Sequence, residues 1–539
     1  MKQKTNPMII QGAILAAAGI ITKLIGFVYR IPMANLLGEE GNGIYSVSFG
    51  IYNVALTLSS YSFPLAVSKL VSTRLAKREP KNAFTAFTTA LILSVLAGLV
   101  SFSILFFGAD LLEAIYKTGG LAYPLRILAP TTFAVALLGV FRGYFQGHSN
   151  MVPTAISQIF EQIVNAVVSV VATVIALKIY ATDEHMRALG AAGATVGTLA
   201  GAITALVFIV LTFTSRLSYT RRVMANDISK AEYKPLLIRE MLATMLPIII
   251  SQTIYQISFT VDDLLFSNLM HARGFEGGEI TALQGVFNTQ YTQLINIPIA
   301  IATAMAASAL PEIVRLSVQK RRSERREKIT TVIKINMAIA IPCAVGLSVL
   351  AHPIITLLFP GLVTYRSVAS GLLIYGSLGC VFYALSTVTT SVLQGCNRMR
   401  IPVVNAFLSF IVHTLIVFVL LRFTPLGIWA RLIGDVTFPL MIATLNIIQL
   451  KKRIGFALDK KHIFLYPLLS SLAMGAVTLI LYTLLGLTPI PMIISFGISV
   501  VTAVVLYGWM VIKLRVFSDD EYLELPAGSK ILRLAQKIR

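Results

Sequence analysis

Charged residues are scarce in this sequence. Only 13% of its 539 residues are Asp, Glu, Lys or Arg, whereas 56% are hydrophobic. A soluble protein carries about 25% charged residues. A larger hydrophobic core does not account for so large a deficit, so the composition excludes an ordinary soluble protein. The mean hydropathy of +0.79 agrees with a chain whose surface lies largely in lipid.

Signals for metal or nucleotide chemistry are also lacking. The three cysteines, Cys343, Cys380 and Cys396, show no CxxC spacing, which argues against a disulfide framework and a zinc site. No Walker loop supports ATP hydrolysis, and no connection is long enough for a domain that binds a nucleotide sugar. We therefore expect no catalytic residues, no metal site, no resident cofactor and no enzymatic activity.

Long apolar runs take up most of the chain. A helix needs about 20 apolar residues to cross the hydrocarbon of a bilayer, and about fourteen segments meet this length. They are 8–36, 43–72, 83–108, 122–146, 152–180, 189–214, 237–268, 282–310, 329–359, 367–394, 402–422, 426–449, 463–485 and 489–513. The predicted fold is an all-α integral membrane protein.

The positive charges fall in alternate connections. The net charge is +21, and Lys and Arg cluster at residues 74–81, 216–230, 320–328 and 451–461, whereas the intervening connections hold few bases. Loops rich in Lys and Arg face the cytoplasm, so the alternation predicts that both termini are cytoplasmic. Bases in short loops indicate topology and contact with anionic lipid, and we expect no nucleic-acid partner.

Two pairs of short, similar segments (called echoes below) indicate an internal repeat. Gln146 and Gly147 end the fourth segment as Gln394 and Gly395 end the tenth, and residues 62–67 in the second segment resemble 296–301 in the eighth. Both echoes are shifted by six helices, and an even shift keeps the orientation, so the repeats are parallel. We predict a first lobe at 1–222, a second lobe at 223–450, and two further helices with a basic tail at 451–539.

Two cations lie within the first segment. Lys23 and Arg30 are seven residues apart, so they share one face of a helix, and Gly26 leaves that face open. Cations around a central cavity suit a phosphate or pyrophosphate, through charge and hydrogen bonds. The alternative is that both side chains extend to the lipid headgroups.

Polar residues form a stripe along the fifth segment. Gln158, Glu161 and Asn165 recur there at helical spacing. Glu161 could pair with a cation of the first helix, carry a proton or bind a sodium ion, because ionisable groups inside a membrane usually serve a partner or a pathway. The alternative is a purely structural bond between helices.

Further polar residues occur in the seventh and eighth segments. Asp262 and Asp263 are paired carboxylates that could bind a cation or share a proton, unless they are simply open to water. Gln293 and Asn296 share a face near Pro298, which interrupts the backbone ladder. We assign both to the substrate-binding set.

Two other arginines are given structural roles. Arg431 and Asp435 are four residues apart in the twelfth segment, so we expect them to neutralise each other. Arg142 lies near the end of the fourth segment, and we expect it at the membrane interface.

The stretch RGYFQGHSNMVPTAISQIFEQI at 142–163 closely resembles the stage V sporulation protein B-like family, which comprises polysaccharide or lipid II flippases of Gram-positive bacteria. That family belongs to the multidrug/oligosaccharidyl-lipid/polysaccharide exporter superfamily. The opening ITKLIGFVYR at 21–30 also resembles the first helix of the lipid II flippases. The resemblance implies alternating access by two lobes around a cationic cavity, with the last two helices forming a groove for a polyprenyl tail.

The sequence departs from the lipid II flippases at two positions. Those proteins have an arginine where Tyr29 stands and another where Gln293 aligns, and Arg30 lies one position later than its counterpart. The resemblance makes Tyr29 and Gln293 candidate substrate contacts. The cavity would be less basic, so another undecaprenyl-linked glycan remains an alternative to lipid II.

Three functions are consistent with these features. The first is a flippase or exporter for an undecaprenyl-pyrophosphate-linked glycan, coupled to protons, sodium ions or the membrane potential. The second is a cation-coupled multidrug exporter that uses Glu161, Asp262 and Asp263. The third, a membrane glycan polymerase, would need a large external loop with catalytic acids. We expect a monomer in the bacterial cytoplasmic membrane whose partners are the lipid-linked glycan, membrane lipids and enzymes of cell-envelope biosynthesis.

Overall fold

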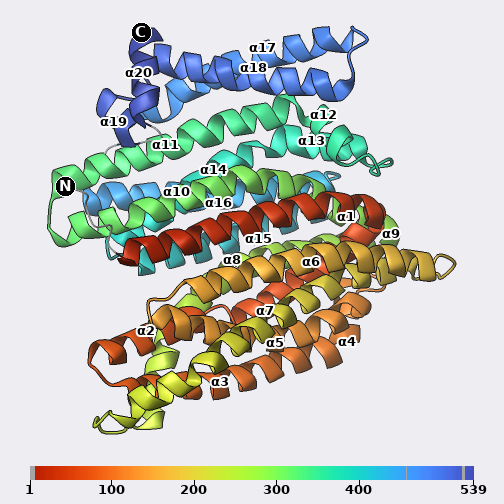
Figure 1. Cartoon of the computed structure of the whole chain (residues 1–539). Coiled ribbons are helices and arrows are strands. Elements are labelled where there is room, and N and C mark those ends of the chain that lie inside the picture. Colours follow the sequence, from red (N-terminus) through yellow and green to blue (C-terminus); the bar gives the residue numbers. More distant parts are fainter. Residues whose placement is uncertain (1–6, 457, 525–527, 539) are drawn as a thin grey trace. The chain divides into compact units, whose positions relative to one another are not determined.

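The computed structural model describes residues 7–456, 458–524 and 528–538, and these residues form helices with no strand among them (Figure 1). The chain divides into two compact units, unit 1 (Met1–Gly285) and unit 2 (Val286–Arg539). The helices of unit 1 are α1 (Pro7–Ser59), α2 (Phe63–Ala76), α3 (Pro80–Phe107), α4 (Ala109–Tyr116), α5 (Ala122–Gly147), α6 (Val152–Ile179), α7 (Met186–Ala225), α8 (Lys234–Ala272) and α9 (Gly277–Gly285). Those of unit 2 are the π-helix η1 (Val286–Tyr291), α10 (Thr292–Val318), α11 (Arg322–Val349), α12 (Ala351–Leu358), α13 (Arg366–Gly376), α14 (Leu378–Gly395), α15 (Arg400–Phe423), α16 (Ile428–Ile454), η2 (Lys461–Leu465), α17 (Tyr466–Gly486), α18 (Met492–Lys513), α19 (Asp519–Glu524) and α20 (Gly528–Ile538).

The described helices include thirteen that are long and apolar enough to cross a membrane. The first of these, Ile14–Ala76, has 63 residues and would be about 95 Å long if straight, three times the hydrocarbon thickness. Its backbone leaves helical geometry at Gly38, where φ is 70°, a value that suits glycine. The two limbs on either side correspond to two predicted crossings, so the all-α membrane fold is confirmed.

Five predicted crossings are not single α-helices, among them 43–72, which is divided between α1 and α2, and 463–485, which begins in η2. The segment 329–359 is divided into α11 and α12 at Leu350, in the turn before Pro353, whose ring cannot pack against the carbonyl four residues earlier. The segment 367–394 is divided into α13 and α14 at Ser377. The segment 282–310 comprises α9, the π-helix η1 and α10. Interruptions of this kind are common where helices line functional sites.

The two Gln-Gly echoes end in the same turn. After α5, Ser149 has φ 55° and the N–H of Asn150 bonds to the carbonyl of Phe145. After α14, Asn397 has φ 59° and the N–H of Arg398 bonds to the carbonyl of Leu393. This six-to-one bond is a common helix ending, and α2, α8, α10 and α18 end in the same way. The turn is therefore a general helix ending in this protein, and the lobe repeat still rests on the sequence similarities.

Close packing of α6 on α7 sets the geometry of unit 1. Gly193, Gly197 and Gly201 are spaced by four along α7. A β-carbon at Gly197 would lie 2.2 Å from the Ser169 hydroxyl, and one at Gly201 would lie 2.5 Å from the Glu161 carbonyl. Small residues at this spacing let membrane helices approach closely. They bring the polar stripe of α6 against the backbone of α7.

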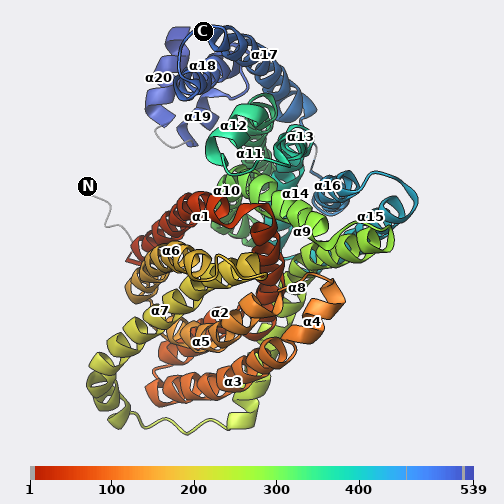
Figure 2. The same cartoon turned by 90° about the vertical axis from the view of Figure 1, so that its right-hand side faces the viewer.

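In unit 2, α17 and α18 lie side by side and the C-terminal helices α19 and α20 pack at one end of this pair (Figure 2). Val516, Phe517, Tyr522 and Ala535 are buried there with residues of α11 and α18. The predicted lobes divide the chain at 222, whereas α8 and α9 pack within unit 1. Compactness is a different property from internal symmetry, so the lobe boundaries stay a prediction.

Candidate functional site

The cations of α1 are open to their surroundings to different degrees. Lys23 is exposed beside Leu24, which is 60% exposed. Arg30 is half-buried, with its guanidinium carbon 5.9 Å from the centre of the Phe49 ring, and its Nε has no hydrogen-bond partner. This Nε atom is itself buried, so Arg30 is less open to its surroundings than Lys23. Exposure of Lys23 is required both for binding a phosphate and for contact with lipid headgroups.

Tyr29 and Asn165 form the centre of a hydrogen-bonded chain between α1 and α6. Asn165 Nδ2 donates to the Tyr29 hydroxyl at 3.3 Å, and the Ser169 hydroxyl donates to Asn165 Oδ1 at 2.9 Å. Tyr29, Asn165 and Ser169 are buried. The sequence placed Tyr29 among the substrate contacts and Asn165 in the polar network, and the structure brings them together as a link between helices.

Glu161 pairs with an arginine of α5. Its carboxylate lies 2.6 Å from Arg142 Nη2 on α5, and Arg142 Nε also donates to the Ser157 hydroxyl at 3.0 Å. Glu161 therefore bonds to α5 rather than to a cation of α1. Arg142 is 12% exposed near the end of α5, and its place at the membrane interface stays a prediction. The pair can form because α5 and α6 are neighbours joined by a short turn.

Two further amide side chains of α6 are Gln158 and Gln162. Gln158 is half-buried and its Oε1 has no hydrogen-bond partner. The helices approach closely at Gly26, where a β-carbon would lie 3.1 Å from Gln162 Nε2. Unit 1 thus has a line of amide, hydroxyl and charged groups along the contact between α1 and α6.

Asp262 and Asp263 lie inside unit 1 rather than in water. They are 5% and 4% exposed. Gln284 Nε2 on α9 donates to the Asp263 carbonyl at 2.9 Å and lies 3.4 Å from its Oδ1. On the other side, a β-carbon at Gly50 of α1 would lie 3.9 Å from Asp263 Oδ2. The alternative of simple water exposure is therefore wrong.

Gln293 and Asn296 differ in their environments. Both lie in the first turns of α10, directly after η1. Gln293 is 8% exposed, whereas Asn296 is exposed. Three residues advance a helix by about 300°, so the two side chains are about 60° apart around the axis. That offset is enough to bury one and leave the other available.

Unit 2 has a second polar cluster around α16. Arg431 is 1% exposed, with its guanidinium carbon 4.3 Å from the Phe287 ring centre, and its Nη2 donates to Asn288 Oδ1 at 2.8 Å. Asp435 accepts hydrogen bonds from the Tyr291 hydroxyl at 2.8 Å and the Tyr383 hydroxyl at 2.9 Å. The sequence identified Arg431 and Asp435 but none of their aromatic and amide partners.

Comparisons with known proteins agree with this architecture. Residues 11–317 match the family described as polysaccharide biosynthesis protein. Two Bacillus subtilis proteins are similar over most of their length. Stage V sporulation protein B is 24% identical, with 96% of this chain and 98% of that protein covered, and Lipid II flippase MurJ is 24% identical, with 74% of each covered. These matches confirm the resemblance expected from the sequence.

Solved structures of transporters share the fold. A Lipid II flippase MurJ in an inward closed conformation aligns with a TM-score of 0.66 at 15% identity, covering 93% of this chain and 98% of that one. An inward-facing multidrug resistance MATE family transporter aligns with a TM-score of 0.67 at 17% identity, covering 80% and 94%. At these identities the likeness concerns the fold alone.

Proposed function

We propose that this chain, which belongs to the polysaccharide biosynthesis protein family, moves an undecaprenyl-pyrophosphate-linked glycan across the bacterial cytoplasmic membrane by alternating access. The observation that carries the proposal is the uncovered Lys23 in the middle of a crossing helix. A cation at that depth costs a few kcal/mol on insertion scales. An anionic ligand that reaches it offsets that cost.

Lys23 and Arg30 have complementary roles in this proposal. Lys23 supplies a mobile point charge for a phosphate oxygen. Arg30, half-buried against Phe49, supplies directed guanidinium donors to the second phosphate. Asn296 is exposed on α10 and able to contact the sugar part, while buried Tyr29 and Gln293 support the helices that carry these groups.

The remaining features of the proposal concern topology and driving force. Both termini face the cytoplasm, following the basic loops. A proton, a sodium ion or the membrane potential drives the cycle, with Glu161, Asp262 and Asp263 as candidate coupling groups. The protein acts as a monomer, with membrane lipids and cell-envelope biosynthesis enzymes around it.

The test compares Lys23→Gln with Lys178→Gln in proteoliposomes. Lys178 is an exposed lysine in the last turn of α6, so it controls for the loss of one charge. We expect Lys23→Gln to lower translocation of lipid II, or of another undecaprenyl-pyrophosphate glycan, at least about tenfold, which corresponds to 1.4 kcal/mol. Lys178→Gln should leave the rate within a factor of two of the unmodified protein.

Two results count against this function. Equal rates for Lys23→Gln and Lys178→Gln would remove Lys23 from the substrate path. A protein that moves none of several undecaprenyl-pyrophosphate glycans, although it is correctly folded in the vesicle, would sink the flippase assignment itself.

A second candidate is a cation-coupled multidrug exporter. The shared fold with the MATE family transporter and the buried pair Asp262 and Asp263 favour it, because buried carboxylates can hold a proton or cation. In a strain lacking its own exporters, this function predicts drug resistance that Asp263→Asn removes. The absence of any resistance phenotype would exclude it.

A further inference from the structure

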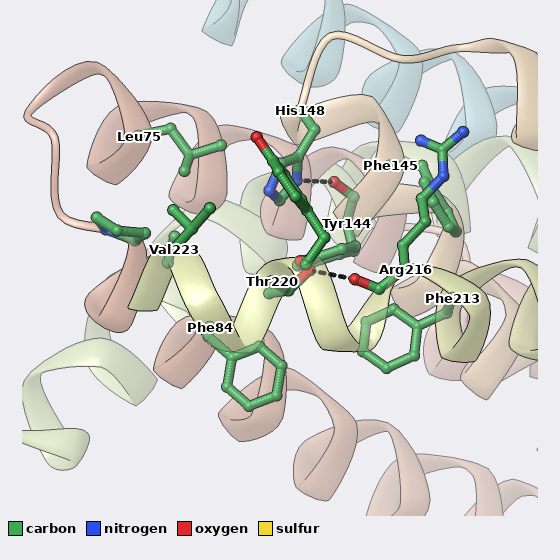
Figure 3. Close-up of a pocket in the computed structure, with 12 residues that line it drawn as sticks. Leu75, Phe84, Tyr144, Phe145, His148, Phe213, Arg216, Thr220 and Val223 are labelled. Atoms are coloured by element: carbon green, nitrogen blue, oxygen red, sulfur yellow. Dashed lines mark hydrogen bonds between the residues drawn. The ribbon is translucent and has the colours of Figure 1, made fainter. Parts of the chain in front are cut away.

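A cavity of about 260 Å³ lies in unit 1, where the C-terminal end of α5 meets the N-terminal end of α3 and the last turns of α7 (Figure 3). Its walls are mainly aromatic, from Phe84, Tyr144, Phe145, Phe213 and Tyr219. The Tyr144 and Phe213 rings pack edge-on with their centres 5.3 Å apart. Phe145 and Tyr144 are buried, so these walls belong to the fixed core of the unit.

One side of the cavity is cationic. Arg216 is exposed there, and its guanidinium carbon lies 5.9 Å from the centre of the Phe145 ring. Among the described residues, no carboxylate forms an ion pair with Arg216. His148 lies opposite, with its Nδ1 2.9 Å from the Tyr144 carbonyl (Figure 3). The cavity therefore combines an apolar interior with an unpaired cation.

The position of the cavity matches the headgroup region of a membrane. The 40 residues of α7 extend about 60 Å, twice the hydrocarbon thickness, and the apolar stretch ends near residue 214. Residues 215–225 therefore reach beyond the hydrocarbon on the side with basic loops. Tyr219 is 73% exposed at this level, as is usual for aromatic residues at the membrane interface.

We infer that this cavity binds an anionic phospholipid of the leaflet on the basic side, with its phosphate at Arg216 and the first carbons of one acyl chain among the aromatic rings. An apolar cavity of about 150 Å³ holds benzene, so this one has room for a longer stretch of chain. It is too small for a whole polyprenyl tail or a whole phospholipid, so only part of a lipid enters it. The exposed guanidinium of Arg216 at the cavity favours an anionic headgroup over a zwitterionic one.

The inference goes beyond the transport function and concerns other residues. Arg216 and the aromatic rings lie at the basic end of unit 1, on α3, α5 and α7, whereas Lys23 is an exposed residue of α1. Failure of the lipid-binding test would therefore not affect the translocation result for Lys23→Gln. Failure of the translocation test would likewise not affect the lipid-binding result.

The experiment measures binding of phosphatidylglycerol to the purified full-length protein by native mass spectrometry, after exchange into micelles of a neutral detergent. Arg216→Gln is compared with Arg222→Gln, which removes the same charge from an exposed position on the same helix outside the cavity. We expect about fivefold weaker binding for Arg216→Gln, the effect of one well-placed base near a headgroup. Arg222→Gln should change binding less than twofold.

A second variant tests the apolar part of the site. Ala83 is buried and lines the cavity, so Ala83→Leu fills space without changing charge. Loss of binding in Ala83→Leu, with an unchanged thermal midpoint, supports the inference. Full binding in that variant overturns it, and equal binding by Arg216→Gln and Arg222→Gln overturns it independently, because only a general basic surface would remain.

Two further lipids identify the occupant. Phosphatidylcholine should bind at least about fivefold more weakly than phosphatidylglycerol if the net charge matters. Undecaprenyl phosphate is tested in the same way. If it binds more tightly than phosphatidylglycerol, and if Arg216→Gln removes this difference, the cavity binds a prenyl lipid and the phospholipid proposal is wrong.

Discussion

Unit 1 leaves Lys23 of α1 exposed, whereas unit 2 encloses the cation of α16. Arg30, the second cation of α1, is half-buried against Phe49. Arg431 is 1% exposed and lies against Phe287 and Asn288. Buried charges persist only when hydrogen bonds and opposite charges satisfy them. The comparison therefore separates charges that hold a unit together from charges that remain available to a ligand.

The same contrast applies to the carboxylates. Asp435 accepts two tyrosine hydroxyls in a fully buried position, while Glu161 is 28% exposed and bonds to Arg142. When a deeply buried polar group loses a hydrogen-bond partner, the free energy of its removal from water is no longer offset. A partly exposed group can turn to water or to a substrate. We expect the first kind to affect stability and the second kind to affect transport.

The largest expected effect is that of Asp435→Leu. Two hydrogen bonds to a charged acceptor are lost, each worth about 1.5 kcal/mol or more, and the hydroxyls of Tyr291 and Tyr383 are left buried without this acceptor. Together these losses should cost about 3 kcal/mol. Thermal unfolding in one detergent gives the midpoint.

The matched variant in unit 1 is Glu161→Gln, which keeps a hydrogen-bonding side chain opposite Arg142 and should cost about 1 kcal/mol. A fall in midpoint for Glu161→Gln as large as that for Asp435→Leu would mean that Glu161 is structural as well. The distinction between the two units would then be lost.

The second prediction compares how each unit secures its basic end. Lys334 of α11, with a side chain 9% exposed, is held by one carboxylate, Glu521 of α19, at 2.7 Å. Arg74 of α2 is held by two carboxylates, Glu232 at 2.7 Å and Glu240 at 2.8 Å. Removing one carboxylate therefore leaves Lys334 without its ion pair, while Arg74 keeps a partner.

We expect Glu521→Gln to raise the rate of tryptic cleavage after Lys530 about tenfold, because a buried charged hydrogen bond contributes at least about 1.5 kcal/mol. Glu232→Gln should raise cleavage after Lys230 only about twofold. Glu324→Gln is the control, since its pair with Arg321 is exposed on both sides. Equal effects of Glu521→Gln and Glu324→Gln would show that the C-terminal helices are held by their apolar contacts alone.

Much of the fold follows from run lengths and loop charges, because a bilayer imposes a minimum helix length and a charge rule that can be read from the sequence. The partners of individual polar groups could not be predicted in this way. Glu161 and Arg142 meet because the α5–α6 turn places them side by side, and Tyr291 reaches Asp435 across 144 positions. Such contacts depend on the rotation of each helix about its axis, which leaves no periodic signal. The glycines spaced by four on α7 mark a close approach but do not identify the helix that packs there.

The smallest predicted effect concerns the linker that follows α7. The backbone N–H of Lys81 donates to Asp227 Oδ2 at 2.8 Å, and the N–H of Ser229 donates to Oδ1 at 2.7 Å. These bonds, that of Lys81 above all, hold the pKa of Asp227 below its usual value of 3.8. A carboxyl with a depressed pKa stabilises the folded linker above the unfolded pKa, and this contribution is lost as the pH falls through the folded pKa.

We therefore expect residues 226–233 to exchange their amide hydrogens faster below about pH 4 than at pH 6, after correction for the intrinsic rate. Asp227→Asn should exchange fast at both values and remove the pH dependence. Asp183→Asn is the matched control, because Asp183 also accepts a backbone N–H, that of His185, in another loop. If exchange at 226–233 still depends on pH in Asp227→Asn, the titrating group is Glu232, which pairs with Arg74 together with Glu240. That result would show that the ion pairs of Arg74, rather than the turn at Asp227, hold this linker.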